Sequence, residues 1–149
     1  MFKVEEPIAA GSGVSEHGDG VVVPAADRNR NFLEVLNGNF DAAIRAGARA
    51  LTFIPGEDGI DVTFHARDGG TFPGERLPGF LIGPIVTRLK IMAGGDITEK
   101  TLAQAGLYSY TYDDRGTKRD YSLTVVTYPL ELGGKKVEAA AVHIREKQD

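Results

Sequence analysis

The chain has 149 residues, of which 42% are hydrophobic and 26% charged, and this composition fits one globular domain with no room for a second large core. It contains no cysteine, so thiol catalysis, disulfides, thiolate zinc sites and iron–sulfur clusters are excluded. A net charge of −4 argues against general nucleic-acid binding. The sequence offers neither a signal peptide nor the ~18 uninterrupted apolar residues of a membrane-spanning helix, so we expect a cytoplasmic protein without membrane insertion.

The first part of the chain is expected to be a flexible tail, residues 1–26, followed by a single domain, residues 27–149. The tail is rich in glycine and serine and shows no helical period. Asp27 can cap a short helix whose apolar side carries Phe32, Leu33, Val35 and Leu36. Asn37-Gly38-Asn39 is predicted to break this helix, and a second helix is expected at about 40–46.

Hairpins are predicted to supply a sheet. Ile60, Val62, Phe64 and Ala66 alternate with polar residues, which is the clearest strand signal in the chain and predicts one wet face. Turn residues at 55–59 connect this strand to an earlier one near 50–54, and Thr71-Phe72 is a candidate for a further short strand. Three later strands are expected near 106–112, 117–127 and 136–145.

One strong helix is predicted between these two groups of strands. Pro84 suits its first turn, Ile85, Val86, Leu89 and Met92 fall at helical spacing, and Gly94-Gly95 ends it. We expect the apolar residues of the strand at 60–66 to face this helix. The whole pattern predicts an α+β fold, with a mostly antiparallel sheet of about five to six strands and helices packed on it.

Neither a catalytic site nor a phosphate-binding loop emerges from the residues. Gly11-Ser12-Gly13 lacks the third glycine of a dinucleotide fingerprint, and no Walker-type loop is present. His17, His65 and His143 stand apart from one another, so the sequence indicates no metal site and no cofactor.

Tyrosines alternate along one predicted strand, with another on the strand that follows. An aromatic stripe of this kind can stack nucleic-acid bases, but a basic surround is missing. We therefore favour cross-strand packing or a protein contact. These tyrosines are Tyr108, Tyr110, Tyr112 and Tyr121.

The helix at 84–92 and the residues after it resemble a characteristic segment of the motor ATPases of type II secretion and type IV pili. The matching run is Arg88-Leu89-Lys90-Ile91-Met92-Ala93-Gly94-Gly95-Asp96-Ile97-Thr98-Glu99. Weaker matches in the same order extend the resemblance over roughly residues 40–145. They comprise Ala43–Ala48, Pro55, Gln104, Gly106, Thr127-Tyr128-Pro129, Gly133 and Lys135.

The resemblance is to the domain that precedes the RecA-like core of these motors. It implies a PAS-like fold, which packs on the core of a neighbouring subunit and whose arginines help to hold ATP. Several positions depart from the family pattern. Ala50, Thr52 and Ile54 replace an Asp, a His and a Glu, and Thr101, Leu107 and Thr124 replace arginines. Threonine and leucine cannot offer a charged fork to phosphate, so the ATP-facing role is largely lost.

We therefore expect a non-catalytic interaction or regulatory domain, whose partner is a protein such as a RecA-like motor and not a nucleic acid. The alternatives are a split part of a true motor ATPase and a PAS-like sensor of a small ligand; weak self-association is also open. The candidate interaction or residual phosphate-facing residues are Arg88, Lys90, Lys100, Gln104 and Lys135. Arg88 and Lys90 are expected to project away from the buried stripe, and Lys100 follows in the next connection. Two roles are open for these charges: a solvated helix end, where basic residues complement the helix dipole and which the sequence slightly favours, and the orientation of an acidic partner surface.

Overall fold

The computed structural model describes residues 32–147. Contacts divide the chain into residues 1–38 and residues 39–149, and the sheet lies entirely in the second unit. The tail predicted at 1–26, its boundary with the domain, the Asp27 cap and His17 fall outside the described residues.

The predicted helix break at Asn37-Gly38-Asn39 is wrong, because one helix, α3 (Phe32–Arg45), runs through it. Apolar residues recur every three or four positions on both sides of these turn formers, which keeps a single buried stripe in phase. A continuous stripe outweighs the local turn preference of Asn and Gly, which costs only about 1 kcal/mol per glycine. The stripe consists of Phe32, Val35, Leu36, Phe40, Ala43 and Ile44.

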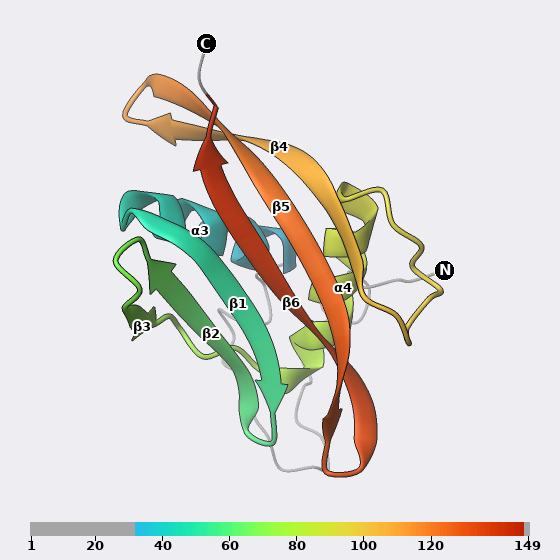
Figure 1. Cartoon of the computed structure of the whole chain (residues 1–149). Helices are drawn as coiled ribbons and strands as arrows, with labels where there is room; N and C mark the ends of the chain where they lie inside the picture. Colours follow the sequence, from blue (N-terminus) through green and yellow to red (C-terminus); the bar gives the residue numbers. More distant parts are fainter. Residues whose placement is uncertain (1–31, 148–149) are drawn as a thin grey trace, which may run out of the picture. The chain divides into compact units, whose positions relative to one another are not determined.

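All six strands join one antiparallel sheet in the order β3-β2-β1-β6-β5-β4 (Figure 1). This confirms the expected sheet-dominated α+β architecture. The hairpin of β1 and β2 forms at the turn predicted at 55–59, and the short strand predicted at Thr71-Phe72 is present. The strands are β1 (Ala48–Gly56), β2 (Gly59–Ala66), β3 (Thr71–Pro73), β4 (Gln104–Asp114), β5 (Thr117–Leu132) and β6 (Lys135–Glu146).

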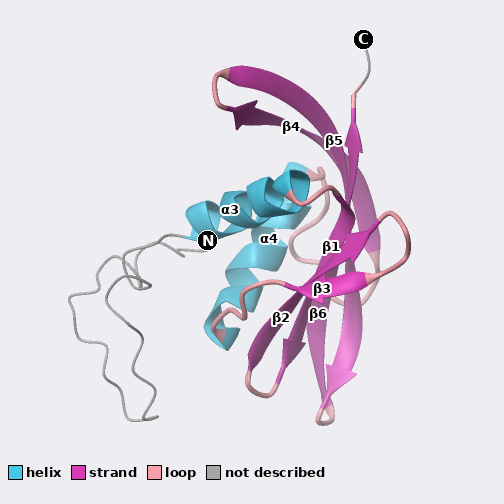
Figure 2. Ribbon diagram, turned by 90° about the vertical axis from the view of Figure 1, so that its left-hand side faces the viewer, coloured by secondary structure: helices cyan, strands magenta, loops and turns pink. Residues whose placement is uncertain are grey.

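Within residues 39–147, the helical segments lie on a single side of the sheet and cover one of its faces (Figure 2). After a 3-10 turn, η1 (Gly79–Leu81), the helix α4 (Ile82–Met92) packs against β4, β5 and β6. Ile85, Val86 and Leu89 are buried as predicted, whereas Met92 is only half-buried.

The expected contact between β2 and α4 needs correction. Ile60, Val62 and Phe64 are buried on the covered face, but the element that packs against β2 is η1, not α4. Phe64 also packs on Phe72 of β3, with ring centroids 5.2 Å apart. Sheet order explains the difference, since β1 lies between β2 and β6, the first of the strands that pack against α4.

A glycine in β4 allows α4 to approach the sheet closely. A Cβ atom at Gly106 would collide with the carbonyl oxygen of Ala93, the residue that caps α4. The backbone at the end of α4 therefore lies directly on β4, at a distance that any side chain at position 106 would prevent.

The tyrosine stripe serves packing inside the covered face. Tyr110 meets the ring of Phe40 edge-on at 5.2 Å and donates a hydrogen bond of 2.6 Å to Asp41. Burial and the Asp41 carboxylate both raise the pKa of Tyr110. Tyr112 is buried, and Arg119 lies over the rings of Tyr112 and Tyr121. Cross-strand packing is thus the role that the structure supports.

Candidate functional site: a basic depression on the open face

Lys90, a predicted interaction residue, is buried inside the domain. Its side chain is 1% exposed, and Nζ lies 2.7 Å from Glu138 Oε2 on β6 and donates a 2.5 Å hydrogen bond to the carbonyl oxygen of Glu99. The expectation that Lys90 projects into solvent is therefore wrong. Lys90 follows Val86 by one helical turn and so shares its buried face. The Glu138 oxygen accepts no well-aligned hydrogen bond, which makes this contact chiefly an ion pair.

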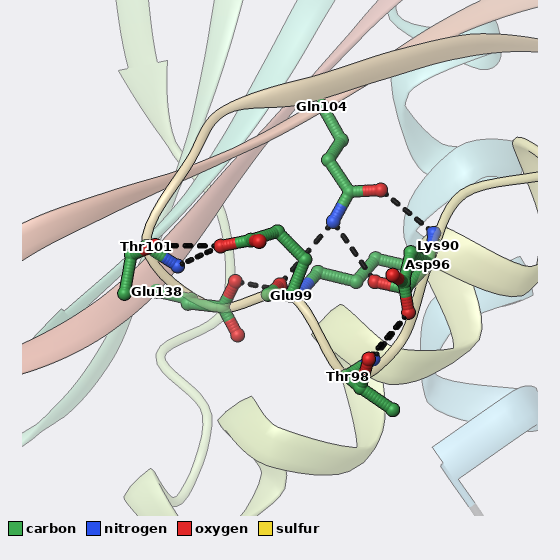
Figure 3. A network of polar contacts seen from close by, with 7 residues as sticks. All are labelled: Lys90, Asp96, Thr98, Glu99, Thr101, Gln104 and Glu138. Carbon is green, nitrogen blue, oxygen red and sulfur yellow. Dashed lines mark hydrogen bonds and ion pairs between the residues drawn. The ribbon is translucent and has the colours of Figure 1, made fainter.

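Gln104, at the start of β4, holds the loop that follows α4 in place through its side-chain hydrogen bonds (Figure 3). Its amide nitrogen donates to the carbonyl oxygens of Asp96 and Glu99, and its amide oxygen accepts from the Asp96 backbone N–H. Lys90 and Gln104 thus meet at the Glu99 carbonyl. Two of the predicted residues come together, but as internal supports of a loop.

Two carboxylates in this loop are held in their charged form. The hydroxyl and backbone N–H of Thr98 donate to Asp96, and those of Thr101 donate to Glu99. These hydrogen bonds lower the pKa of each carboxyl group below its usual value. The polar side chains of the loop after α4 therefore form hydrogen bonds within the loop itself.

The other three predicted residues do not join this network. Arg88 is half-buried, and no described residue forms a hydrogen bond with its Nε. Lys100 is exposed in the loop, and Lys135 is exposed at the first position of β6, next to the β5–β6 turn. The structure does not assemble the five predicted residues into one site.

A different group of basic residues meets on the other face of the sheet, which no helix of the described chain covers (Figure 2). A shallow depression of about 510 Å³ opens there. Arg49, Arg67, His143 and Arg145 contribute its basic groups, and Leu107, Ser122, Thr124 and Ile144 complete the lining. We call these eight residues the basic depression.

Strand register explains how the floor of the basic depression forms. Leu107, Thr124, His143 and Ala50 are successive cross-strand neighbours on β4, β5, β6 and β1. Neighbouring strands lie about 4.8 Å apart, so the short side chain of Thr124 leaves a hollow between its longer neighbours, Leu107 and His143. Two residues away from the pair of Thr124 and His143, Ser122 on β5 pairs with Arg145 on β6, and Arg145 lines the edge of the hollow.

A bulge in β1 adds Arg49 to this face. Ala48 pairs with Ala66 and Ala50 pairs with His65, so Arg49 is an extra residue on β1. Bulges reorient a side chain, and here the bulge places an arginine on the depression at a position that strict alternation would turn toward the helices. Arg49 Nε donates to the carbonyl oxygen of Ala66, and Arg67 follows immediately in sequence.

The arginines of the basic depression have no acidic partner within residues 32–147. None of Arg49, Arg67 and Arg145 forms an ion pair there. The neighbouring carboxylates have other hydrogen bonds: Asp68 accepts from the backbone of Gly70, and Asp120 accepts from Thr111. Three guanidinium groups are therefore available to an anionic ligand, each offering the planar fork that binds carboxylate or phosphate.

The depression also contains two positions that the resemblance singled out. Leu107 and Thr124, which stand where the resembling motors carry arginines, are direct cross-strand partners there. Leu107 is 69% exposed. No sequence signal pointed to the basic depression, because His143 stands apart from the other histidines and Arg49, Arg67 and Arg145 belong to no motif.

The described residues offer no group of three or more His, Asp or Glu side chains that could hold a metal ion. Among the helices in this range, none is long and apolar enough to cross a membrane.

Comparison with known proteins gives little that bears on function. No family model matches the chain, and no curated protein matches it. Among solved structures, the chain is similar to the Legionella pneumophila ATPase DotB, with 14% sequence identity and a TM-score of 0.43. The match covers 73% of this chain and 28% of DotB, so the similarity concerns only part of that ATPase. Membership of the secretion ATPases stays a prediction.

Proposed function

We propose that this chain is a non-catalytic protein-interaction domain, related to the PAS-like domain that precedes the core of secretion and pilus motor ATPases. Its partner would be a protein, and its role would be regulatory or scaffolding. The relation to these motors depends on the sequence resemblance around Arg88–Glu99, and the interaction role depends on the geometry of the sheet.

The observation that carries the proposal is the contrast between the two faces. On the covered face, Lys90 and Gln104 are engaged in internal contacts, and using Lys90 to bind phosphate would break a buried ion pair. On the open face, three arginines that form no ion pair with any residue in 32–147 line a depression. An uncovered sheet face with unpaired charge suits docking of another molecule better than turnover of a nucleotide.

The absence of catalysis is tested by calorimetric titration of the full chain with Mg-ATP and by an assay for released phosphate. We expect no hydrolysis and no binding in the micromolar range. Micromolar affinity would contradict a non-catalytic role and would favour a split part of a motor ATPase, with Arg88, Lys100 or Lys135 as phosphate ligands.

The interaction role is tested by affinity purification from native extract with the tagged full chain. A control is a tagged chain of similar size and charge. We expect at least one protein to be enriched reproducibly and to bind the purified chain directly in calorimetry. If no protein binds the purified chain directly, the interaction role is wrong.

A further inference from the structure

We infer that the basic depression binds an acidic, extended segment of a partner protein, an inference that depends on the proposed interaction role. The segment would present glutamate or aspartate side chains to Arg49, Arg67 and Arg145. It would place an apolar side chain against Leu107.

The charge of the basic depression favours an acidic ligand. The chain as a whole carries a net charge of −4, yet the lining of the depression contains three arginines and a histidine and no acidic residue. A basic region on an acidic protein attracts an acidic ligand, while the rest of the protein surface repels that ligand. Carboxylates pair with arginine through two parallel hydrogen bonds, which adds orientation to the attraction.

Shape and polarity favour a peptide among acidic ligands. The floor consists of short side chains, Ser122 and Thr124, whose hydroxyl groups can bond to a peptide backbone. Leu107 leaves 69% of its surface in water, which an apolar partner side chain would cover. In an extended peptide, alternate residues point to the same side, so carboxylate and apolar groups can face different parts of one depression.

Nucleic acid fits the depression less well. The tyrosines that could stack bases lie on the covered face, where Tyr110 is bonded to Asp41. The eight lining residues include no aromatic ring except the imidazole of His143. Three arginines would neutralise only a few phosphates, while the net negative charge of the chain opposes a long polyanion.

The test uses the full chain and defined probes. A fluorescein-labelled decapeptide in which glutamate alternates with leucine is titrated against the protein by fluorescence anisotropy, alongside the same peptide with glutamine for glutamate. Two-dimensional ¹⁵N NMR of the full chain locates the bound peptide. A ten-nucleotide single-stranded oligothymidine is the nucleic-acid probe.

The matched variants change charge equally at two places. One, the arginine variant, carries Arg49→Gln, Arg67→Gln and Arg145→Gln; the control carries Arg115→Gln, Lys118→Gln and Lys136→Gln, all exposed positions outside the depression. Circular dichroism checks that both remain folded. We expect the arginine variant to bind the acidic peptide about tenfold more weakly or worse, and the control variant to bind within about twofold of wild type.

The outcomes distinguish an error about this surface from an error about the proposed function. NMR shifts centred on Leu107, Ser122, Thr124 and His143, with loss only in the arginine variant, support the inference. Equal binding by both variants, shifts elsewhere, or tighter binding of the oligonucleotide overturns it. If a partner found by affinity purification binds the arginine variant as well as wild type, the interaction role survives and only this surface is wrong.

Discussion

Replacing Glu138 with Gln removes the negative partner of a lysine that has almost no access to water. The Lys90 side chain is 1% exposed, and in the variant its charge would face neutral acceptors, the Glu99 carbonyl oxygen and the new amide oxygen. Breaking a buried ion pair on one side costs about 3–5 kcal/mol, because a charge remains without compensation. Glu138 itself is 14% exposed, so some water reaches the pair, and we expect the lower end, about 3 kcal/mol.

Urea denaturation measures this loss. The chain has no tryptophan, so unfolding is followed by far-ultraviolet circular dichroism or by the five tyrosines. With a denaturant dependence of about 2 kcal/mol/M, the midpoint should fall by about 1.5 M. Asp61→Asn is the control, since the Asp61–Arg76 pair is 3.0 Å long but more than half exposed on both sides. It should cost less than about 1 kcal/mol.

A second variant distinguishes charge from packing. Lys90→Met with Glu138→Leu removes both charges and keeps similar volume, and such replacements of buried pairs are often neutral or stabilising. We expect the double variant to lie within about 1 kcal/mol of wild type. If Glu138→Gln alone is within about 0.5 kcal/mol of wild type, Lys90 is not held by this pair and the reasoning fails.

Three further results should follow from the same structure. Gly106→Ala should destabilise the domain by more than about 2 kcal/mol because its Cβ collides with backbone at Ala93, whereas Gly83→Ala, in open space in α4, should be neutral or stabilising in the same urea assay. Thr127→Val should stabilise the domain by about 1 kcal/mol and so raise the urea midpoint, because the Thr127 hydroxyl is buried without a hydrogen-bond partner among residues 32–147. In a carboxyl ¹³C NMR titration, Asp96 should have a pKa below 3.8, and Thr98→Ala should raise it; an unchanged value would mean that the turn does not form in solution.

The pKa of Asp96 also fixes the sign of a pH effect. Because the folded value is lowered, the contribution of Asp96 to stability is present above the ordinary value of 3.8 and is lost as the pH falls through the lowered value. Glu99 behaves in the same way relative to 4.5. The loop after α4 should therefore lose stability as the pH falls through these lowered pKa values, while its hydrogen bonds to Gln104 and Lys90 remain.

The sheet could be predicted because its signals are local. Alternation in Ile60–Ala66 and the glycine-containing turns define strands and hairpins without knowledge of distant contacts. The order of hairpins in the sheet is not local, and the pairing of β1 with β6 decides which strands lie under α4. The predicted packing of β2 against α4 failed for that reason.

The continuous α3 shows the opposite error. Asn37, Gly38 and Asn39 are each poor helix formers, and their local preference suggested a break. The spacing of Leu36, Phe40 and Ile44 across them already indicated one stripe. Weighing periodicity over the whole segment would have predicted the single helix.

The two sets of basic residues show what decides the use of a charge. Lys90 looked available because it is charged and lies beside an apolar stripe, but its partner, Glu138, is 48 positions further along the chain and reaches it only through the fold. Arg49 lies just outside the strand predicted near 50–54, and only a bulge, formed between β1 and β2, places it on the open face. Both facts depend on pairings between strands. Charge that the fold neutralises serves stability, and charge that the fold leaves unpaired on a hollow surface is the better guide to a ligand.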